Sequence, residues 1–385
     1  MSDYLSLPSR LRNTVLGIGL AASLGLAGYG LAVSEAHAAP AAVPAHPALQ
    51  TIRLQLNPMT AVAHETGILK EEYDKVGIHQ IVLVAPGSAQ LSGAEAALLN
   101  NGGVAIAQRM IYPAVVHAAR GLDAVIVWES QPSDGNRTPI LARADNKEVN
   151  SIADLDGKKF GSSRVSCYWT APFETLTKAG LPLDSRTQQG RIRYQSIDQG
   201  NAAVAALLSG AIDATAMHLG TSSAAALYTK GQVKVVGRTP TQGVYERGAG
   251  RVSYFAMRDF ADRYPQAVQA FLIAQERAKQ WVQDHPDEAA KIVAKATRVP
   301  EDVAKFQITD ASQFFFMEGE RDANNTRVTI KEFQDWYVAN GDDILTDHRL
   351  SDDRIHALVD ERFFGNGAYS PYRTCLLYTS PSPRD

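Results

Sequence analysis

Apolar and polar positions along the chain form short strand-like runs that are separated by segments with helical spacing. Thr51–Leu56 alternates with a period of two, which is typical of a strand with one buried face. Ala61–Val76 has helical spacing and stops before Gly77, a residue type that often ends helices. The next predicted strands are Gln80–Ala85, Val104–Ala107 and Asp123–Trp128, and the helices between them are Leu91–Asn100 and Tyr112–Arg120. This alternation predicts a mostly parallel sheet that is covered by helices.

A second series of alternating elements begins at Thr138–Arg143, which is predicted to be a strand. The further strands expected are Lys158–Ser163, Arg191–Ile197, Ala214–Met217, Val233–Val236 and Arg251–Met257. The segments predicted to be helical between them are Ile152–Gly157, Thr170–Lys178 and Ala202–Leu208. After the last strand only helices are expected, at Gln266–Gln283, Pro286–Ala296, Glu301–Gln307 and Ile330–Asn340. The pattern thus predicts two α/β units and a helical region that follows them.

The two ends of the chain depart from this pattern. Arg10 and Arg12 precede the apolar run Val15–Val33, and the small-residue stretch Ala36–Ala39 follows, which is the order of a secretory signal peptide. We expect residues 1–38 to be this signal, cleaved after Ala38; the alternative is a membrane anchor. No later stretch approaches the ~20 apolar residues of a membrane span. At the other end, residues 375–385 have no periodicity and resemble the translation of a sequencing adapter, so they are excluded from the predicted domains.

Composition narrows the classes of function. The remaining ~325 residues suit two domains rather than one. The formal net charge of −3 gives no strongly basic surface, so a nucleic-acid partner is not expected. Cys167 and Cys375 are the two cysteines, and no CxxC or Cys/His spacing indicates a metal site. A glycine-rich phosphate loop is also missing from the sequence, so no cofactor is predicted.

Four segments, in this order, carry a resemblance to a known family. They are Gly67–Gly77, Ile152–Lys159, Ala205–Ala214, and Asp259–Val268 together with Asp284–Ala290. The first is similar to a helix end with the pattern G-x-F/L-x-K-E…G, and the second to the entry to a second lobe with the pattern S-x-x-D-L-K-G-K-K. The third is similar to a turn with the pattern A-L-x-x-G-x-V-D-A, and the last two are similar to helices with the patterns R-D-F…P-x-x-V and N-P-D-E-A-A. On these motifs the chain resembles the nitrate/sulfonate/taurine-type solute-binding proteins of ABC importers, from about Ile52 to Ala311.

The resemblance implies an α/β fold of the two-lobe periplasmic binding protein class, type II, with two hinge strands. One lobe would combine residues 50–140 with 254–370, and the other would comprise residues 141–253. The hinges would lie near Pro139–Ala144 and Arg251–Ala256. The implied function is non-enzymatic: a monomeric receptor in the periplasm captures a small anionic organic solute between its lobes. The implied partners are that solute and an ABC permease/ATPase complex in the inner membrane.

Candidate ligand contacts follow from a rule for parallel α/β sheets, in which ligands lie beyond the carboxyl ends of strands. The segment Arg164–Trp169 is the leading candidate, because a helix N-terminus offers backbone N–H groups to an anion. Here Ser166 adds a hydroxyl donor, and Tyr168 and Trp169 could pack on the ligand body. In the family this segment usually reads A-V-x-x-G-S-T, so Val165 replaces a glycine. The full set of predicted contacts is Met59, Thr60, Gln108, Arg164, Ser166, Tyr168, Trp169 and His218.

Several alternatives stay open from the sequence. Ser166 or Thr170 could only cap the helix while the aromatic rings belong to the core. His218 could be structural instead of a ligand contact. Tyr168 and Trp169 would also suit an aromatic heterocycle such as a thiamine-precursor pyrimidine, and the receptor could serve a sensor instead of a transporter. Cys167, near a helix N-terminus, could be the nucleophile of a desulfinase-like enzyme on the same fold, although the sequence indicates no base beside it.

Overall fold

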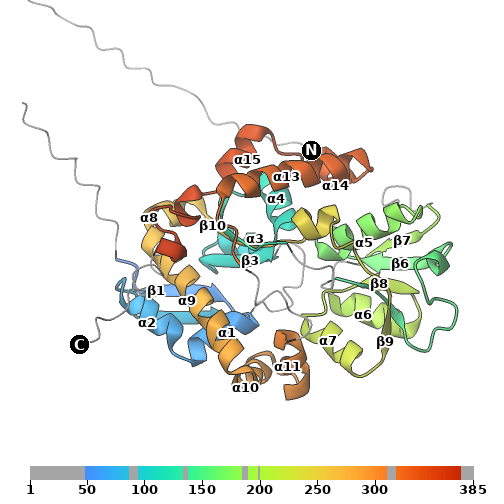
Figure 1. Cartoon of the computed structure of the whole chain (residues 1–385), viewed down its shortest axis with the longest axis horizontal. Helices are drawn as coiled ribbons and strands as arrows, with labels where there is room; N and C mark the ends of the chain where they lie inside the picture. The colour runs from blue at the N-terminus through green and yellow to red at the C-terminus, as the bar shows by residue number, and fades with distance from the viewer. Residues whose placement is uncertain are drawn as a thin grey trace, which may run out of the picture. The chain divides into compact units, whose positions relative to one another are not determined.

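Ten strands form two five-stranded sheets in the residues that the computed structural model describes, which are 48–85, 94–132, 138–183, 190–197, 200–309 and 318–373 (Figure 1). The first sheet has the order β2-β1-β3-β10-β4 and consists of β1 (Thr51–Gln55), β2 (Gln80–Val84), β3 (Ile106–Met110), β4 (Ala124–Glu129) and β10 (Val252–Met257). The second has the order β7-β6-β8-β5-β9 and consists of β5 (Ile140–Arg143), β6 (Lys159–Ser162), β7 (Arg193–Ser196), β8 (Ala214–Ala216) and β9 (Val233–Gly237).

Each sheet contains one strand that runs against the other four. In the first sheet β10 pairs antiparallel with both β3 and β4, whereas β1 pairs parallel with β2 and β3. In the second sheet β5 pairs antiparallel with β8 and β9, whereas β6 pairs parallel with β7 and β8. The mostly parallel α/β sheets predicted from the sequence are therefore confirmed.

Helices lie between the strands and follow β10. They are α1 (Pro58–Glu65), α2 (Ile68–Asp74), α3 (Ala94–Asn100), α4 (Ile111–Ala119), η1 (Ala153–Leu155), α5 (Cys167–Lys178), α6 (Gly200–Ser209), α7 (Ser222–Thr229), the π-helical turn η2 (Tyr245–Ala249), α8 (Arg258–Arg263), α9 (Pro265–Asp284), α10 (Pro286–Thr297), α11 (Glu301–Thr309), α13 (Ala323–Ala339), α14 (Asp343–Asp347), α15 (Asp352–Leu358) and η3 (Glu361–Phe363). The predicted helices after β10 are present, and α13 begins seven residues before its predicted start at Ile330.

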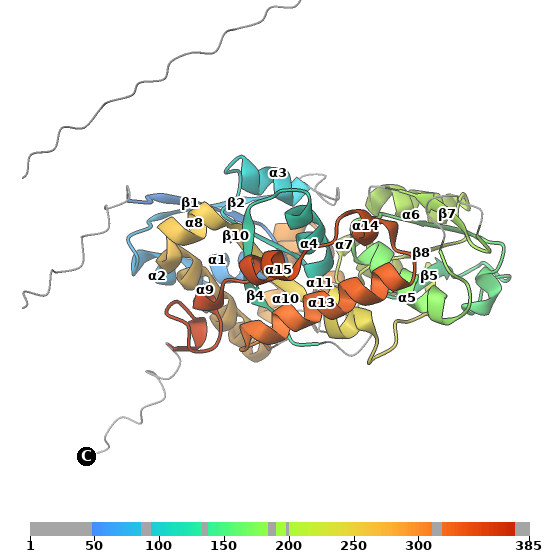
Figure 2. The ribbon, with the colours of Figure 1, turned by 90° about the horizontal axis from the view of Figure 1, so that it is seen from above.

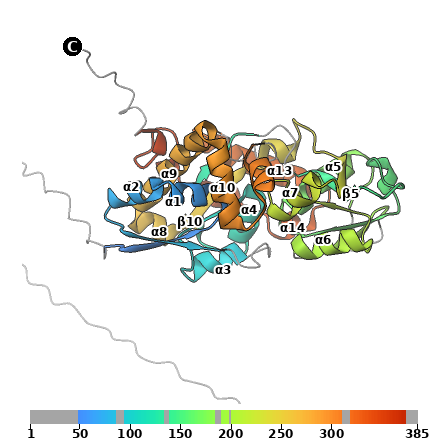
Figure 3. The same ribbon diagram turned by 90° about the horizontal axis from the view of Figure 1, so that it is seen from below.

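Helices cover both faces of each sheet. Figure 3 shows α3 on the opposite side of the first sheet from α1 and α9. Side chains that alternate along β10 follow this division, since Phe255 clusters with Leu99 of α3, whereas the Tyr254 ring contacts Phe271 of α9 with centroids 5.0 Å apart. In the second sheet, Leu141 of β5 packs in a cluster with residues of α6 and α7. Burial on both faces explains why the strand segments are so apolar.

The predicted helix Ala61–Val76 is wrong in its extent. The structure contains two helices instead, because Gly67 has φ +81°, a left-handed conformation that glycine adopts without steric cost. The first helix also begins earlier, since the Asn57 side chain accepts a hydrogen bond from Thr60 N at 2.8 Å and caps a helix that starts at Pro58. Met59 and Thr60, two of the predicted ligand contacts, thus belong to the first turn of α1.

Some predictions concern segments outside the described residues. These are the signal peptide with its cleavage after Ala38 and the tail from Cys375 to Asp385. Within the segments that are described, no helix combines the length and apolar composition of a membrane span.

Candidate functional site

The N-terminus of α5 is built around Ser166. The backbone of Ser166 is extended, and its Oγ accepts a hydrogen bond from Tyr168 N at 3.1 Å while donating one to Ser163 O at 3.0 Å. Its carbonyl accepts from Trp169 N and Thr170 N. Ser166 is therefore the N-cap of α5, and the segment that was predicted as a loop up to Trp169 becomes helical at Cys167.

Arg164 and Trp169 face the C-terminal helices. The Trp169 side chain is fully buried, and its indole N–H donates to Asp342 Oδ2 at 2.7 Å. Arg164 forms an ion pair with Asp343, and its guanidinium lies 5.1 Å from the Trp169 ring centroid. Figure 2 shows α13 beside α5, where Tyr337 OH donates to Thr170 O at 2.9 Å. In this arrangement both predicted contacts join α5 to the segment that follows α13.

Gln108 lies within β3, not after it as predicted, because the pairing of β3 with β10 continues to Met110. Its Nε2 donates to Tyr254 OH at 3.3 Å, and Tyr254 OH donates to Gln275 Oε1 at 3.2 Å. Burial raises the pKa of Tyr254, so the phenol remains protonated and can act as this donor. The Gln108 amide is thus engaged in a chain of hydrogen bonds that leads to α9.

Arg109, the neighbour of Gln108, projects to the other face of the sheet and was absent from the predicted contacts. Its Nη1 donates to Glu95 Oε1 at 3.1 Å, and its Nη2 donates to Val165 O at 3.4 Å. Burial raises the pKa of Glu95, and the charge of Arg109 opposes that rise. Arg109 therefore connects the first sheet with the turn that precedes α5 in the second unit. The sequence signal for this difference is the period of two along a strand, which places the side chains of Gln108 and Arg109 on opposite faces of β3.

Tyr168 and His218 lie together at the carboxyl edge of the second sheet. Burial raises the pKa of the Tyr168 phenol, whereas the Thr221 side chain, the Arg109 charge and the His218 backbone act to lower it. The buried His218 ring accepts a hydrogen bond from Gly220 N at Nδ1, at 2.9 Å, so the neutral ring carries its proton on Nε2. Of the predicted contacts, these two are brought close to each other and to Arg109.

Several buried donors at the ends of parallel strands are not satisfied by the described residues. Thr60 Oγ1 follows β1, Arg109 Nε lies near the end of β3, and Ser163 Oγ and Arg164 Nε follow β6; none of these atoms has a hydrogen-bond partner in the described part of the chain. A buried donor without a partner costs ~1–3 kcal/mol, and unsatisfied groups are rare in native interiors. These donors are consistent with a ligand that supplies acceptors. Glu95 Oε2 is a buried acceptor that likewise has no hydrogen-bond partner among the described residues.

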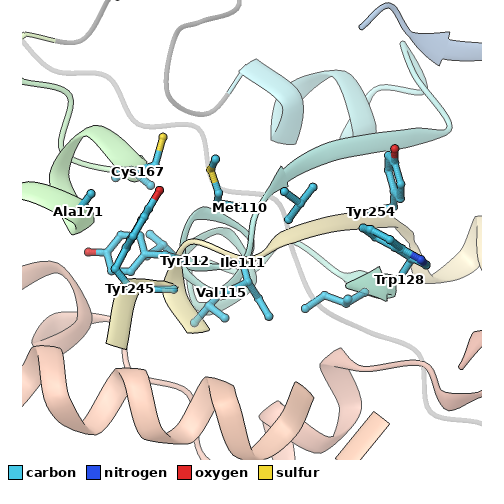
Figure 4. Close-up of a cluster of buried hydrophobic side chains, with 14 of the residues drawn as sticks. Met110, Ile111, Tyr112, Val115, Trp128, Cys167, Ala171, Tyr245 and Tyr254 are labelled. Carbon is cyan, nitrogen blue, oxygen red and sulfur yellow. The ribbon is translucent and has the colours of Figure 1, made fainter. Parts of the chain in front are cut away.

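The cysteine that motivated an enzyme hypothesis is the first residue of α5. Cys167 is 8% exposed and belongs to a buried hydrophobic cluster, in which Figure 4 draws it with Met110, Ala171 and Tyr245. Among the described residues, no group of three or more His, Cys, Asp and Glu side chains is placed to hold a metal ion.

Comparison with known proteins identifies the family. The family model described as NMT1/THI5 like matches residues 82–289, which is more than half of the chain. The chain belongs to the NMT1/THI5-like family. No curated protein sequence matches the chain.

Solved structures share its fold at low sequence identity. The alkanesulfonate-binding protein SsuA from Xanthomonas axonopodis pv. citri, bound to MOPS, is 18% identical with a TM-score of 0.65, and the match covers 82% of this chain and 99% of that one. The periplasmic aliphatic sulphonate binding protein SsuA from Escherichia coli is 18% identical with a TM-score of 0.63, covering 81% and 98%. A variant of DSZB in complex with biphenyl-2-sulfinic acid is 16% identical with a TM-score of 0.57, covering 85% and 99%.

The predicted resemblance and fold class are thereby confirmed at the level of family and fold. The chain has the fold of periplasmic binding proteins, with two mixed sheets flanked by helices. At these identities the likeness concerns the fold alone.

Proposed function

We propose that the chain is an exported solute-binding receptor of an ABC importer that captures a small anionic organic solute of the sulfonate, nitrate or taurine type. The observation that carries the proposal is the set of buried donors, Thr60 Oγ1, Arg109 Nε and Ser163 Oγ, at the carboxyl ends of strands from both sheets. Hydroxyl and guanidinium donors suit an oxyanion. The neighbours that share the fold include binding proteins for alkanesulfonate and aliphatic sulphonate.

The proposed lobes are residues 50–140 with 254–370 and residues 141–253, joined by hinges near Pro139–Ala144 and Arg251–Ala256. Strand membership supports this division, because the first sheet combines β1 to β4 with β10 and the second contains β5 to β9. The hydrogen bond of 2.8 Å between Thr138 and Tyr245 joins the two connecting segments. The predicted signal peptide and the periplasmic fold relatives support export to the periplasm, as a monomer that serves a permease/ATPase complex.

The proposed solute contacts are Thr60, Arg109, Ser163, Tyr168 and His218. We assign to Arg109 the contact with the anionic group of the solute. Its Nη2 donates a hydrogen bond to the turn before α5, and its Nε has no hydrogen-bond partner among the described residues. Met59, Gln108, Arg164, Ser166 and Trp169 remain predicted contacts, but the bonds described above give four of them structural roles and Met59 is 4% exposed. An enzyme based on Cys167 is a weaker candidate, because that side chain lies in a buried hydrophobic cluster.

The direct test is a thermal-shift screen of residues 39–374 against alkyl and aryl sulfonates, taurine, nitrate, bicarbonate, carboxylates and thiamine-type pyrimidines. A solute at a hundred times its Kd stabilises the folded state by about 2.7 kcal/mol, which raises the unfolding midpoint measurably. A shift with anions supports the proposal. A shift with pyrimidines alone would replace the solute class, and turnover of a sulfinate that requires Cys167 would replace the function.

Arg109→Gln is expected to weaken binding of the responding anion, because it removes a charge-assisted contact. The loss should be ~1.5–3 kcal/mol, or about 10- to 100-fold in Kd by titration calorimetry. The matched control is Arg193→Gln, since Arg193 is exposed on β7. Equal affinities of the two variants would remove Arg109 from the site, provided that both retain the wild-type unfolding midpoint.

A further inference from the structure

A buried ionic cluster lies where the chain leaves the first sheet and where it returns. Glu129 is the last residue of β4, and Arg251 immediately precedes β10. Ser130 N donates to Val252 O at 2.8 Å, and Val252 N donates to Ser130 Oγ at 3.0 Å. A third segment joins them through the bridge between Ser130 and Gly319. Both connections between the sheets therefore begin or end at this junction.

The cluster contains two carboxylates and one guanidinium. The side chains of Glu129, Arg251 and Glu320 are 0%, 3% and 8% exposed. Arg251 donates from Nε to Ser130 O at 2.6 Å, from Nη1 to Thr329 Oγ1 at 3.2 Å, and from Nη2 to Glu320 Oε2 at 3.1 Å. If both carboxylates were ionised, the cluster would hold an uncompensated negative charge, which is costly in a buried site.

The hydrogen bonds decide which carboxylate is ionised. Glu320 accepts from Arg251 and from the backbone N–H groups of Arg321 and Asp322, at 2.8 and 3.0 Å. Although burial acts to raise the pKa of Glu320, these bonds and the Arg251 charge hold it below its ordinary value. The Glu129 carboxylate accepts one hydrogen bond from the described residues, from Thr326 Oγ1 at 2.5 Å. Its Oε1 lies 3.4 Å from Arg251 Nε but has no hydrogen-bond partner among the described residues.

We propose that Glu129 is a proton-sensitive lock at this junction, which holds the returning strand in place when Glu129 is protonated and loosens it when Glu129 is ionised. Among the described residues, the charged groups that face Glu129 are Arg251, from the segment before β10, and Glu320, from the segment before α13. Thr326 of α13 and Ser253 of β10 are its uncharged neighbours. The lock does not depend on which solute the protein binds.

The direction of the pH dependence follows from the environment of Glu129. Burial raises the pKa of Glu129 to about 7, against the lowering effect of the Arg251 charge and the Thr326 hydrogen bond. In the unfolded chain a glutamate titrates near ~4.3. Because the folded state binds the proton more tightly, the stabilisation is present at acidic pH and is lost as the pH rises from ~4.3 through about 7.

The test compares unfolding midpoints between pH 5 and pH 8.5 for the mature protein and two variants. Glu129→Gln keeps a neutral side chain of similar shape, and the matched control is Glu332→Gln, an exposed position on α13. The wild type and the control should lose several degrees of midpoint as the pH rises through neutrality, whereas Glu129→Gln should lose distinctly less. Parallel curves for all three proteins would overturn the proposal.

A third variant tests whether Glu320 is the ionised partner of Arg251 and Glu129 is the carboxylate that titrates. Glu320→Gln leaves Glu129 as the acidic partner of Arg251, so its transition should move to lower pH by ~1 unit or more. An unchanged transition would contradict the proposal.

If Glu129→Gln fails to fold, infrared spectroscopy of the wild-type protein tests the proposal instead. A protonated carboxyl band should be present at pH 6 and lost at pH 8.5, and absence of this band at pH 6 would overturn the proposal.

Discussion

Two serines three positions apart show how residues of one type divide between structure and proposed binding. Ser166 Oγ both donates and accepts within the turn before α5, and so it has a complete structural role. Ser163 is 4% exposed, and its Oγ has no hydrogen-bond partner among the described residues. The segment was predicted to contact a ligand through Ser166, but the hydrogen bonds favour Ser163.

Ser166→Ala should therefore destabilise the protein without weakening solute binding. Loss of an N-cap side chain costs ~1 kcal/mol, which denaturant unfolding can measure. Ser166→Thr, which retains a capping hydroxyl, is the matched control and should recover most of that loss. Ser163→Ala should show the reverse behaviour, with near-normal stability and weaker binding. A binding defect confined to Ser166→Ala would restore the original assignment.

The sequence predicted which segments of the chain form the site more accurately than it predicted which residues contact the solute. The rule that ligands lie at the carboxyl ends of parallel strands selected the segments that contain Thr60, Arg109 and Ser163 or their neighbours. It could not decide between Gln108 and Arg109, because that depends on which face of β3 meets α9. Nor could it predict that Trp169 donates to Asp342, since 173 positions separate these residues along the chain.

At the scale of elements, the turn between α13 and α14 connects both units of the fold. Asp342 accepts hydrogen bonds from Tyr112 OH of α4 and from the indole N–H of Trp169 of α5, at 3.0 and 2.7 Å to Oδ2. Its Oδ1 also accepts from Leu345 N at 2.9 Å and caps α14. One fully buried carboxylate thus positions α5, the helix whose N-terminal turn lies beside Arg109.

Asp342→Ala should be among the more damaging single substitutions in this region. It leaves two buried donors without their acceptor, and each such group costs ~1–3 kcal/mol. The matched control, Asp353→Asn at an exposed position of α15, should remain within ~0.5 kcal/mol of the wild type. Chemical denaturation of the two variants makes the comparison. Similar stabilities would show that Tyr112 and Trp169 find other acceptors when Asp342 is removed.

Element boundaries were the least predictable part of the fold, for local reasons. Asn57, Ser166 and Asp322 each cap a helix through a side-chain oxygen, so these helices begin near polar residues that resemble loops in the sequence. The interior of most strands and of the longer helices was predictable, because burial there imposes a regular period, whereas the short helices α7, α8, α14 and α15 were not predicted. The first turns are defined by a single hydrogen bond, which a hydrophobic pattern does not record.

At the scale of the whole molecule, the two antiparallel strands have related positions. β5 is the first strand of the second sheet, and β10 is the strand that returns to the first sheet, so each directly follows a connection between sheets. The hydrogen bond between Thr138 and Tyr245 lies on these connections, and the Glu129–Arg251–Glu320 cluster joins their ends to the segment before α13. The connections are therefore more strongly cross-linked than a pair of simple loops would be.

If the chain is a two-lobe receptor, binding of its solute should favour a closed arrangement of the lobes. A ligand that contacts both lobes can shift the population only through its higher affinity for the closed state, and hinge closure is the expected motion. Small-angle scattering of the wild-type protein should therefore show a smaller radius of gyration at saturating solute. Arg109→Gln, at a solute concentration that saturates only the wild type, should retain the ligand-free radius. A thermal shift without any change in scattering would retain the binding function and argue against closure.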